Sequence, residues 1–205
     1  MFTGIVEKTT TVVSVTKKRD TLVVRLKKPA SLKLVKGQSI SVDGICSTVV
    51  SHAATYFDVV YMPQTLKMST AGHFKKGTVV NIEKSLTLQS FVDGHLVQGH
   101  VDAMASLADI KKSGDSSVMS FTLPKELLPF VVPQGSICIN GVSLTVASVT
   151  GTTCKVALIP FTLKHTNLGQ LKRGSLVNVE VDMVARYLGK ALRAMVMGNA
   201  KKNRE

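Results

Sequence analysis

The sequence of 205 residues predicts an all-β fold, in which two similar small barrels stand in tandem and a C-terminal α-helix follows. Three observations predict this fold. The chain repeats itself at a domain-sized interval. Each repeat contains short runs rich in Val, Ile and Thr that are separated by turn residues. The last segment has apolar residues at helical spacing.

The repeat is visible in two phrases, "VDGICSTVV" at 42–50 and "INGVSLTVA" at 139–147. Around them, residues 39–85 align without a gap onto residues 136–182. Such an interval exceeds the roughly 20–50 residues of solenoid repeats, so it indicates a duplicated domain. Identical pairs include Gly44 with Gly141, Thr48 with Thr145, Pro63 with Pro160, Asn81 with Asn178 and Glu83 with Glu180. We therefore expect a first barrel over 1–96, a second barrel over 97–187 and a C-terminal segment over 188–205.

Within a repeat the pattern is that of strands. About six short runs in a domain of this size favour a small closed barrel, because closure removes exposed strand edges. A short helical turn is expected after Pro63 and again after Pro160, each ended by a Gly. In the first repeat the expected strands cover 9–15, 21–26, 38–42, 46–51, 56–62 and 78–83.

The C-terminal segment has no counterpart in the first repeat. Residues 184–199 place apolar side chains at 184, 188, 192, 195 and 196, which predicts one amphipathic helix. Its apolar stripe can pack on its own chain or on symmetry-related copies, and the sequence leaves both alternatives open.

Composition narrows the function classes. The net charge is +13 and 44% of residues are hydrophobic, so a packed core is expected. A basic chain can bind nucleic acid, but the Lys and Arg residues are scattered in pairs without interleaved aromatic residues. We therefore expect no nucleic-acid partner.

The cysteines and the apolar runs exclude other classes. Three cysteines without C-x-x-C spacing argue against a disulfide framework and against a zinc site, and Cys138 and Cys154 are expected in the core. No apolar run approaches the roughly 20 residues of a membrane helix. The N-terminal segment lacks the pattern of a secretory signal. The sequence predicts a soluble cytoplasmic protein without membrane association.

Six phrases occur in order along almost the whole chain: "MFTGIVE", "GICST", "GHLVQGHVD", "GVSLTV", "IPFTL" and "VNVEVDMVARYL". Together with the duplication, they resemble the riboflavin synthase family. The resemblance implies two six-stranded Greek-key barrels and a homotrimer held by the C-terminal helix. It implies dismutation of two 6,7-dimethyl-8-ribityllumazine molecules to riboflavin and 5-amino-6-(D-ribitylamino)uracil, the last step of riboflavin biosynthesis. No metal and no cofactor is implied, and lumazine synthase is a candidate partner.

A reaction between two identical substrates needs two unlike sites, because one molecule donates a four-carbon unit and the other accepts it. The resemblance implies catalytic roles for Cys46, His100, Ser143 and Asp182, and each of them aligns with a different residue in the other repeat. We expect Cys46 to assist at C7 of the acceptor. Ser143 and Asp182 are expected to form a polar dyad that moves a proton from the C7 methyl group of the donor.

The resemblance also implies ligand contacts in both repeats. In the first half they are Phe2, Gly4, Ile5, Val6, Ser39, Cys46, Ser47, Thr48, Val60, Tyr61, Met62, Pro63, Gln64 and Thr65. In the second half they are Gly99, His100, Val101, Gln134, Ser143, Leu144, Thr145, Ala157, Leu158, Ile159, Pro160, Phe161 and Thr162. Glu83 and Glu180 recur at one position, which predicts a shared hydrogen bond to barrel or ligand. His95 is also a feature of the family, and a structural role is one alternative for it.

Two other functions stay open at this point. Lumazine proteins of the same architecture bind the ligand as an antenna without turnover. Those proteins typically lose the histidine segment and the second "SLT", whereas this chain keeps "GHLVQGHVD", Ser143 and Thr145. Small barrels can also bind oligonucleotides. We expect the enzyme.

Overall fold

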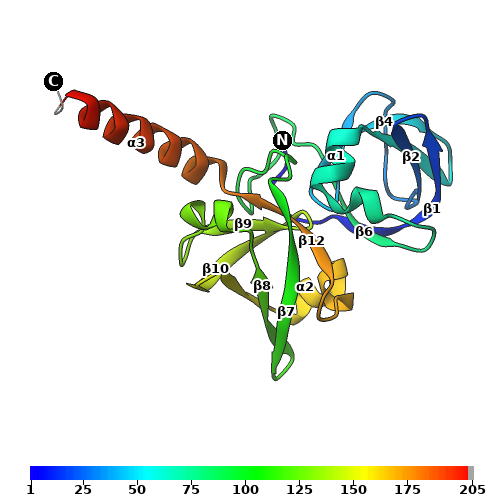
Figure 1. Ribbon diagram of the computed structural model, residues 1–205. Helices are drawn as coiled ribbons and strands as arrows, with labels where there is room; N and C mark the ends of the chain where they lie inside the picture. The colour runs from blue at the N-terminus through cyan, green and yellow to red at the C-terminus, as the bar shows by residue number, and fades with distance from the viewer. Residues whose placement is uncertain (203–205) are drawn as a thin grey trace.

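The computed structural model describes the backbone of residues 1–202 and the side chains of residues 1–192. Two closed barrels lie side by side and a long helix projects from the second (Figure 1). Neighbouring strands are antiparallel, in the order β1-β2-β5-β4-β3-β6 in the first barrel and β10-β11-β8-β7-β12-β9 in the second. The predicted pair of six-stranded barrels with a C-terminal helix is confirmed.

The first barrel contains β1 (Lys8–Lys18), β2 (Thr21–Lys27), β3 (Ser39–Val42), β4 (Ile45–His52), β5 (Tyr56–Tyr61), α1 (Pro63–Met68), a 3-10 turn (Thr70–His73) and β6 (Val79–Lys84). The second contains β7 (Ala103–Ser113), β8 (Ser116–Thr122), a 3-10 turn (Lys125–Phe130), β9 (Ser136–Ile139), β10 (Val142–Thr150), β11 (Thr153–Leu158), α2 (Pro160–His165), a 3-10 turn (Asn167–Gln170) and β12 (Leu176–Val181). Every strand predicted in the first repeat is present.

Each barrel has its own apolar core, which β-branched residues of alternate strand positions fill. In β4, Ile45 and Val49 point inward and are buried, while Cys46 and Thr48 between them are exposed. Cys138 and Cys154 are buried, as predicted. The alternation thus decides which residues of each strand can meet a ligand.

The prediction that a Gly ends each short helix is wrong. Helices α1 and α2 end at Met68 and His165, and Gly72 and Gly169 lie in the 3-10 turns that follow. A Cβ on Gly72 would lie 2.7 Å from the carbonyl oxygen of Leu66. These glycines therefore permit a close approach of the turn to the helix, rather than the left-handed conformation of a C-cap.

The opening segment of each barrel contacts the other barrel. The Ser143 amide of the second barrel donates to the Gly4 carbonyl over 2.7 Å, and the Cys46 amide of the first donates to the Gly99 carbonyl over 2.8 Å. Phe2 and Val97 pair through two backbone hydrogen bonds and pack with Cys138. Each opening segment therefore lies against the Asp/Asn-Gly hairpin of the other barrel.

A buried polar seam joins the barrels next to these hairpins. The Asn167 amide donates to Asn81 Oδ1 over 2.7 Å, and the Thr70 amide donates to Asn178 Oδ1 over the same distance. Asp43 of the first barrel accepts two hydrogen bonds from the second barrel, at its carbonyl from Asn178 Nδ2 and at Oδ1 from Asn167 Nδ2. The two barrels therefore dock in one register.

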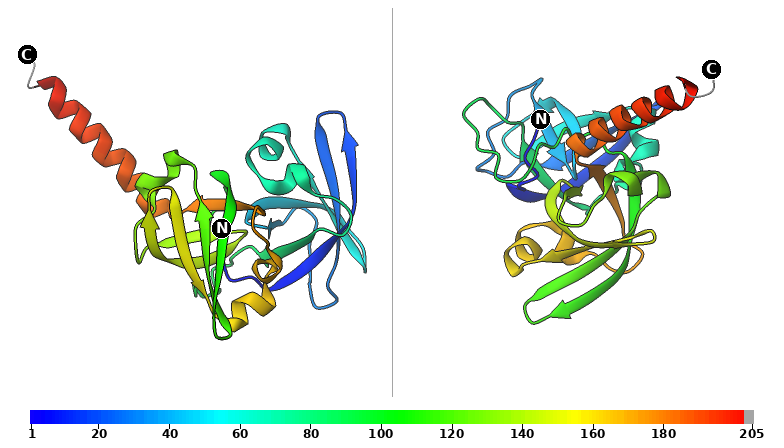
Figure 2. Two further views of the ribbon diagram at one scale, coloured as in Figure 1. Left: turned by 60° about the horizontal axis from the view of Figure 1, so that its bottom comes forward. Right: turned by 90° about the vertical axis from the view of Figure 1, so that its left-hand side faces the viewer.

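Helix α3 (Met183–Lys202) projects away from both barrels (Figure 2). The helix predicted over 184–199 is confirmed, but it begins at Met183, before the position 188 that we expected to open the C-terminal segment. Arg186 anchors its first turns through an ion pair of 2.6 Å with Asp102. Val184, Tyr187, Leu188 and Leu192 are exposed on it. Positions 195 and 196 lie outside the described side chains.

Candidate functional site

The mouth of the first barrel gathers six of the predicted site residues around a cavity of about 310 Å³. A volume of this size suits a small ligand. Three lining residues were not predicted: Ile45, Met68 and Ser69. The predicted residues in the lining are Cys46, Gln64, Thr65, Gly99, His100 and Val101.

The chain places Cys46 at this mouth because β4 exposes alternate side chains and because Gly99 supports it from the other barrel. A Cβ on Gly99, whose φ is +79°, would lie 2.7 Å from the Cβ atom of Cys46. Only glycine fits this close approach without strain. His100 follows directly and is exposed, so an exposed thiol and an exposed imidazole border the same cavity.

The second barrel has a different pair of polar side chains at the position equivalent to Cys46, and we call this position the mouth of the second barrel. The Oγ atom of Ser143 lies 2.6 Å from the Nδ1 atom of His95, which comes from the linker between the barrels. The Nε2 atom of His95 is buried without a hydrogen-bond partner among the described residues. Burial lowers the pKa of His95, and the nearby charge of Asp182 opposes this shift. The imidazole is therefore held neutral beside the serine hydroxyl.

The expected dyad of Ser143 and Asp182 is not formed by the hydrogen bonds of the described residues. Asp182 Oδ1 instead accepts from the Val184 amide over 2.8 Å, and its carbonyl accepts from the Arg186 amide. This is the role of an N-cap residue at the start of α3. The contact that sequence reasoning missed is His95, for which the sequence leaves a structural role open.

The two recurring glutamates hold the opening segments in place. Glu83 accepts from the amides of Thr3 and Gly4, and Glu180 accepts from those of Gln98, Gly99 and His100. The predicted shared hydrogen bond to the barrel is confirmed.

These glutamates also have shifted acidities. Burial raises the pKa of Glu83, and it raises the pKa of Glu180 to about 7 against the lowering effect of the amide donors. Both carboxyl groups accept hydrogen bonds from the opening segments, so their protonation would weaken the bonds that hold these segments in place.

Several predicted ligand residues face the barrel interior instead. Ser47 and Tyr61 are buried and their hydroxyl groups lie 3.0 Å apart. Leu144 and Leu158, at the equivalent positions of the second barrel, are also buried. The polar pair of one barrel is thus an apolar pair in the other, and neither pair lies at the surface. Phe2 is fully buried, and it packs with Val97 and Cys138.

The remaining predicted residues lie at or near the surface, or contribute backbone. Ile5, Thr48, Met62, Pro63, Gln134, Thr145, Ala157, Ile159, Pro160 and Phe161 are exposed, and Val6, Ser39, Val60 and Thr162 are half-buried. Gly4 is buried and reaches the second mouth through its carbonyl group.

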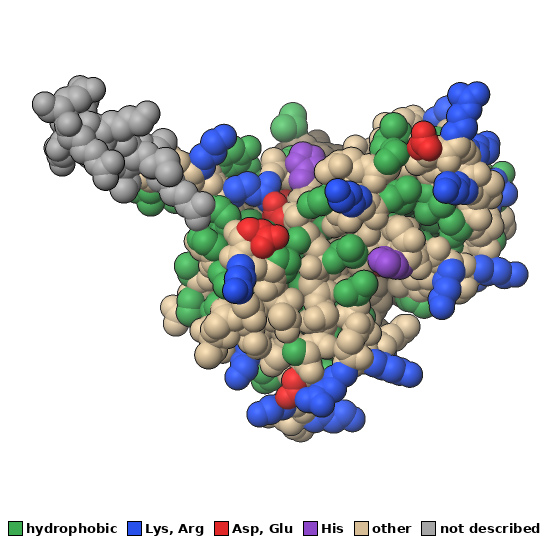
Figure 3. Space-filling view, viewed as in Figure 1, with side chains coloured by type: hydrophobic (Ala, Val, Ile, Leu, Met, Phe, Trp, Pro, Cys, Tyr) green, Lys and Arg blue, Asp and Glu red, His purple; other side chains and the backbone are tan. Residues whose placement is uncertain are grey.

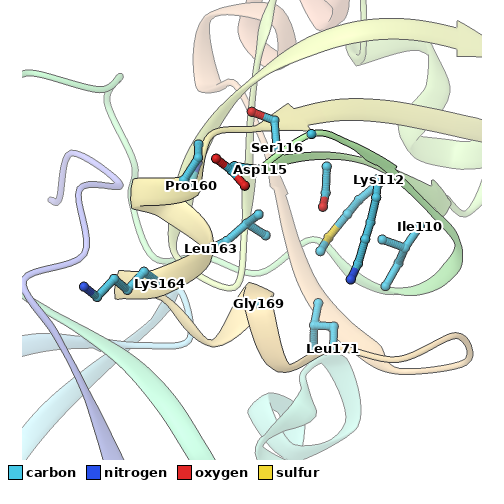
Figure 4. Close-up of a pocket in the computed structure, with 12 residues that line it drawn as sticks. Ile110, Lys112, Asp115, Ser116, Pro160, Leu163, Lys164, Gly169 and Leu171 are labelled. Carbon is cyan, nitrogen blue, oxygen red and sulfur yellow. The ribbon is translucent and has the colours of Figure 1, made fainter.

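A larger cavity, of about 710 Å³, lies between the β7–β8 hairpin and α2 (Figure 4). Pro160 is the one predicted ligand residue in its lining, which otherwise includes Lys112, Leu163 and Leu171. Cavity volume and the chemistry of the lining residues therefore point to different sites. We assign the site to the cavity of about 310 Å³, because it gathers the Cys46 thiol and the His100 imidazole and is lined by residues of both repeats.

The surface charge offers no obvious nucleic-acid groove on the face that Figure 3 shows. Lys and Arg side chains are spread over both barrels there, and do not form one continuous stripe. A binding groove for single strands would combine such a stripe with aromatic side chains.

The comparisons with known proteins agree with this geometry. The model of the lumazine binding domain matches the chain twice, at residues 3–85 and 98–182. The chain belongs to the riboflavin synthase family of lumazine-binding proteins. It is 35% identical to riboflavin synthase of Actinobacillus pleuropneumoniae over 92% of this chain and 88% of that one. It is 36% identical to riboflavin synthase of Mycobacterium bovis over 95% of this chain and 99% of that one.

Solved structures of the same family show the same arrangement of two barrels. The crystal structure of LumP complexed with riboflavin superposes with a TM-score of 0.80 at 27% identity, over 88% of this chain and 99% of that one. The structure of LumP complexed with 6,7-dimethyl-8-(1'-D-ribityl) lumazine gives a TM-score of 0.79 at 25% identity, with the same coverage. None of the helices in the described part of this chain combines the length and the apolar character that a membrane span requires.

Proposed function

We propose that this chain is a riboflavin synthase that converts two molecules of 6,7-dimethyl-8-ribityllumazine into riboflavin and 5-amino-6-(D-ribitylamino)uracil. The observation that carries the proposal is the chemical difference between two equivalent mouths. The first presents Cys46 beside His100, and the second presents Ser143 beside His95. Relatives named riboflavin synthase match over nearly the full length, and this supports the same activity.

The difference between the mouths suits the reaction, because two identical substrates must play opposite roles. In the tautomer that carries its proton on Nε2, the neutral imidazole accepts from the Ser143 hydroxyl at Nδ1 and can take up a proton through that hydroxyl, as general base catalysis requires. This pair would remove the proton from the C7 methyl group of the donor. At the first mouth, the exposed Cys46 thiol would attack or assist at C7 of the acceptor.

The remaining contribution of the protein is positional. Two lumazine rings held face to face react as one bound pair, and orientation of this kind can supply up to about 7–11 kcal/mol of the barrier. We propose that the pair forms between the first barrel of one subunit and the second barrel of a neighbour. The exposed apolar side chains of α3 support such an assembly, a homotrimer, because this helix buries little of its apolar surface on its own chain.

One assay tests the proposed activity. Purified protein is incubated with 6,7-dimethyl-8-ribityllumazine, and the absorbance of riboflavin is followed together with release of the diaminouracil. We expect one riboflavin for every two lumazines consumed. Tight binding of the lumazine without any turnover would instead support an antenna protein like LumP, and would overturn the proposal.

A further inference from the structure

A second difference between the repeats lies on the short helices at the two mouths. The rings of Phe161 and His165 in α2 stack with centroids 4.0 Å apart and an angle of 24° between their planes. The Nδ1 atom of His165 lies 2.8 Å from the carbonyl oxygen of Phe161. A carbonyl oxygen can only accept, so Nδ1 carries the proton and the imidazole ring is fixed under the phenyl ring.

The other face of Phe161 is open. Its side chain is 66% exposed although His165 covers one side, so apolar area remains that contact with a ligand would remove from water. In the first repeat the equivalent residues are Gln64 and Met68, and both line the cavity beside Cys46. The same alignment assigns Phe161 and His165 to the mouth that contains Ser143.

We propose that Phe161, held by His165, is a stacking shelf for one face of a planar heteroaromatic ligand at the mouth of the second barrel. The inference rests on the proposed function, because it concerns the ligand of the same pair of sites. Ring stacking with centroids about 4.5–7 Å apart is the usual arrangement of such contacts, and the open face of Phe161 leaves room for it.

The shelf makes the two mouths unequal in affinity as well as in chemistry. At the first mouth, Gln64 and Met68 offer an amide and a thioether where the second mouth offers two stacked rings. An aromatic pair adds stabilisation that corresponds to a roughly three- to tenfold difference in affinity. The ring with the larger aromatic system gains most from the shelf, so the second mouth is the site that prefers riboflavin.

The absence of tryptophan from the chain makes a direct test possible. Phe161→Trp introduces a single tryptophan whose emission reports a ring stacked on it. Phe161→Leu keeps an apolar side chain but removes the ring. Phe91→Leu, which removes an exposed ring from the linker between the barrels, is the matched control. Riboflavin is the probe, and binding is followed by equilibrium dialysis and by fluorescence of the flavin and of the tryptophan.

We expect Phe161→Leu to weaken one of the two riboflavin sites three- to tenfold, and Phe91→Leu to leave both sites unchanged. In Phe161→Trp, riboflavin should quench the tryptophan emission with the affinity of that site. Unchanged affinities in Phe161→Leu, or an unquenched tryptophan at saturating riboflavin, would overturn the shelf. A changed sedimentation coefficient with unchanged riboflavin binding would place Phe161 at a contact between copies and would overturn it as well.

The test separates this inference from the proposed function. Wild-type protein that fails to convert the lumazine sinks the proposed activity, whereas the riboflavin titrations still decide whether Phe161 stacks on the ligand. Melting temperatures of the three variants show whether each is folded, and the tryptophan variant keeps a large aromatic side chain in case Phe161→Leu is unstable.

Discussion

The Nδ1 atom of His95 lies 2.6 Å from the Oγ atom of Ser143, and this contact ties the linker between the barrels to the mouth of the second barrel. Ser143 also donates its amide to Gly4 from the opening segment of the first barrel. Both ends of the first repeat therefore meet at one serine. A reactive hydroxyl in this position depends on the docking of the two barrels and not on the second barrel alone.

His95→Gln should lower the rate of riboflavin formation by roughly a hundredfold or more, since general acid–base groups contribute on this scale. Burial lowers the pKa of His95, so the neutral imidazole is present at neutral pH and is lost as the pH falls through the lowered pKa. The acid limb of the wild-type rate profile should therefore lie below the ordinary imidazole pKa of about 6.5. The measurement is the pH dependence of kcat.

His52→Gln is the matched control, because His52 is exposed at the end of β4. It should leave the rate profile unchanged. If His95→Gln lowers the melting temperature but keeps both the rate and the acid limb, His95 is structural and the dyad with Ser143 has no part in the reaction.

Two cysteines distinguish a site role from a packing role. Cys46→Ser converts the first mouth to the residue of the second repeat, and we expect a large loss of turnover with little change in melting temperature, because Cys46 is exposed. Cys154→Ser places a hydroxyl in the core, and we expect destabilisation of about 1–3 kcal/mol with activity retained below the new melting temperature. Equal losses of turnover and stability in Cys46→Ser would contradict a role in the reaction.

The strands could be predicted from the sequence because runs of Val, Ile and Thr between turn residues are local signals, whereas the site role of Cys46 came from the family resemblance. The duplication extended the same argument to Ser143. The partner of Ser143 could not be predicted in this way, since His95 lies outside the aligned ranges of the two repeats and reaches the serine only after the barrels dock. The closest sequence signal was the phrase "GHLVQGHVD", which contains both His95 and His100.

The role of Asp182 shows a second limit. Its position at the end of β12 resembles a site residue, but the chain enters α3 one residue later and the carboxylate caps that helix. The polar seam was also invisible, because Asp43 and Asn167 lie far apart in the sequence and each belongs to a turn whose ordinary chemistry already explains it.

The exposed apolar side chains of α3 predict an assembly that a charge should disrupt. Leu188→Glu combined with Leu192→Glu replaces two apolar side chains, which are 58% and 61% exposed in the single chain, with carboxylates. We expect the sedimentation coefficient to fall from that of a trimer to that of a monomer, because burying unpaired charges at an interface is costly. Turnover should fall with it, since the proposed reacting pair spans two subunits.

Lys190→Glu is a control on the same helix, since Lys190 is an exposed polar position. It introduces a carboxylate without removing an apolar contact, and it should leave sedimentation nearly unchanged. A trimer that survives the double substitution would mean that α3 does not hold the assembly together.

Asp43 predicts how the docking of the two barrels responds to pH. Burial raises its pKa to about 8, against the lowering effect of hydrogen bonds from the Asn81 amide and the Asn167 side chain. The folded chain therefore binds this proton more tightly than the unfolded chain, whose carboxyl has a pKa of about 3.9. The contribution of this proton to the free energy of unfolding is present at low pH and is lost as the pH rises through about 8.

Asp43→Asn keeps the acceptor oxygen and removes the charge, as Asn140 does in the second repeat. We expect this variant to melt higher than wild type at pH 9, by about 2–4 °C for each kcal/mol gained, and to match it at pH 4. Asp20→Asn, at an exposed turn, should show no such divergence, and parallel melting curves of Asp43→Asn and wild type across this range would rule out the buried proton.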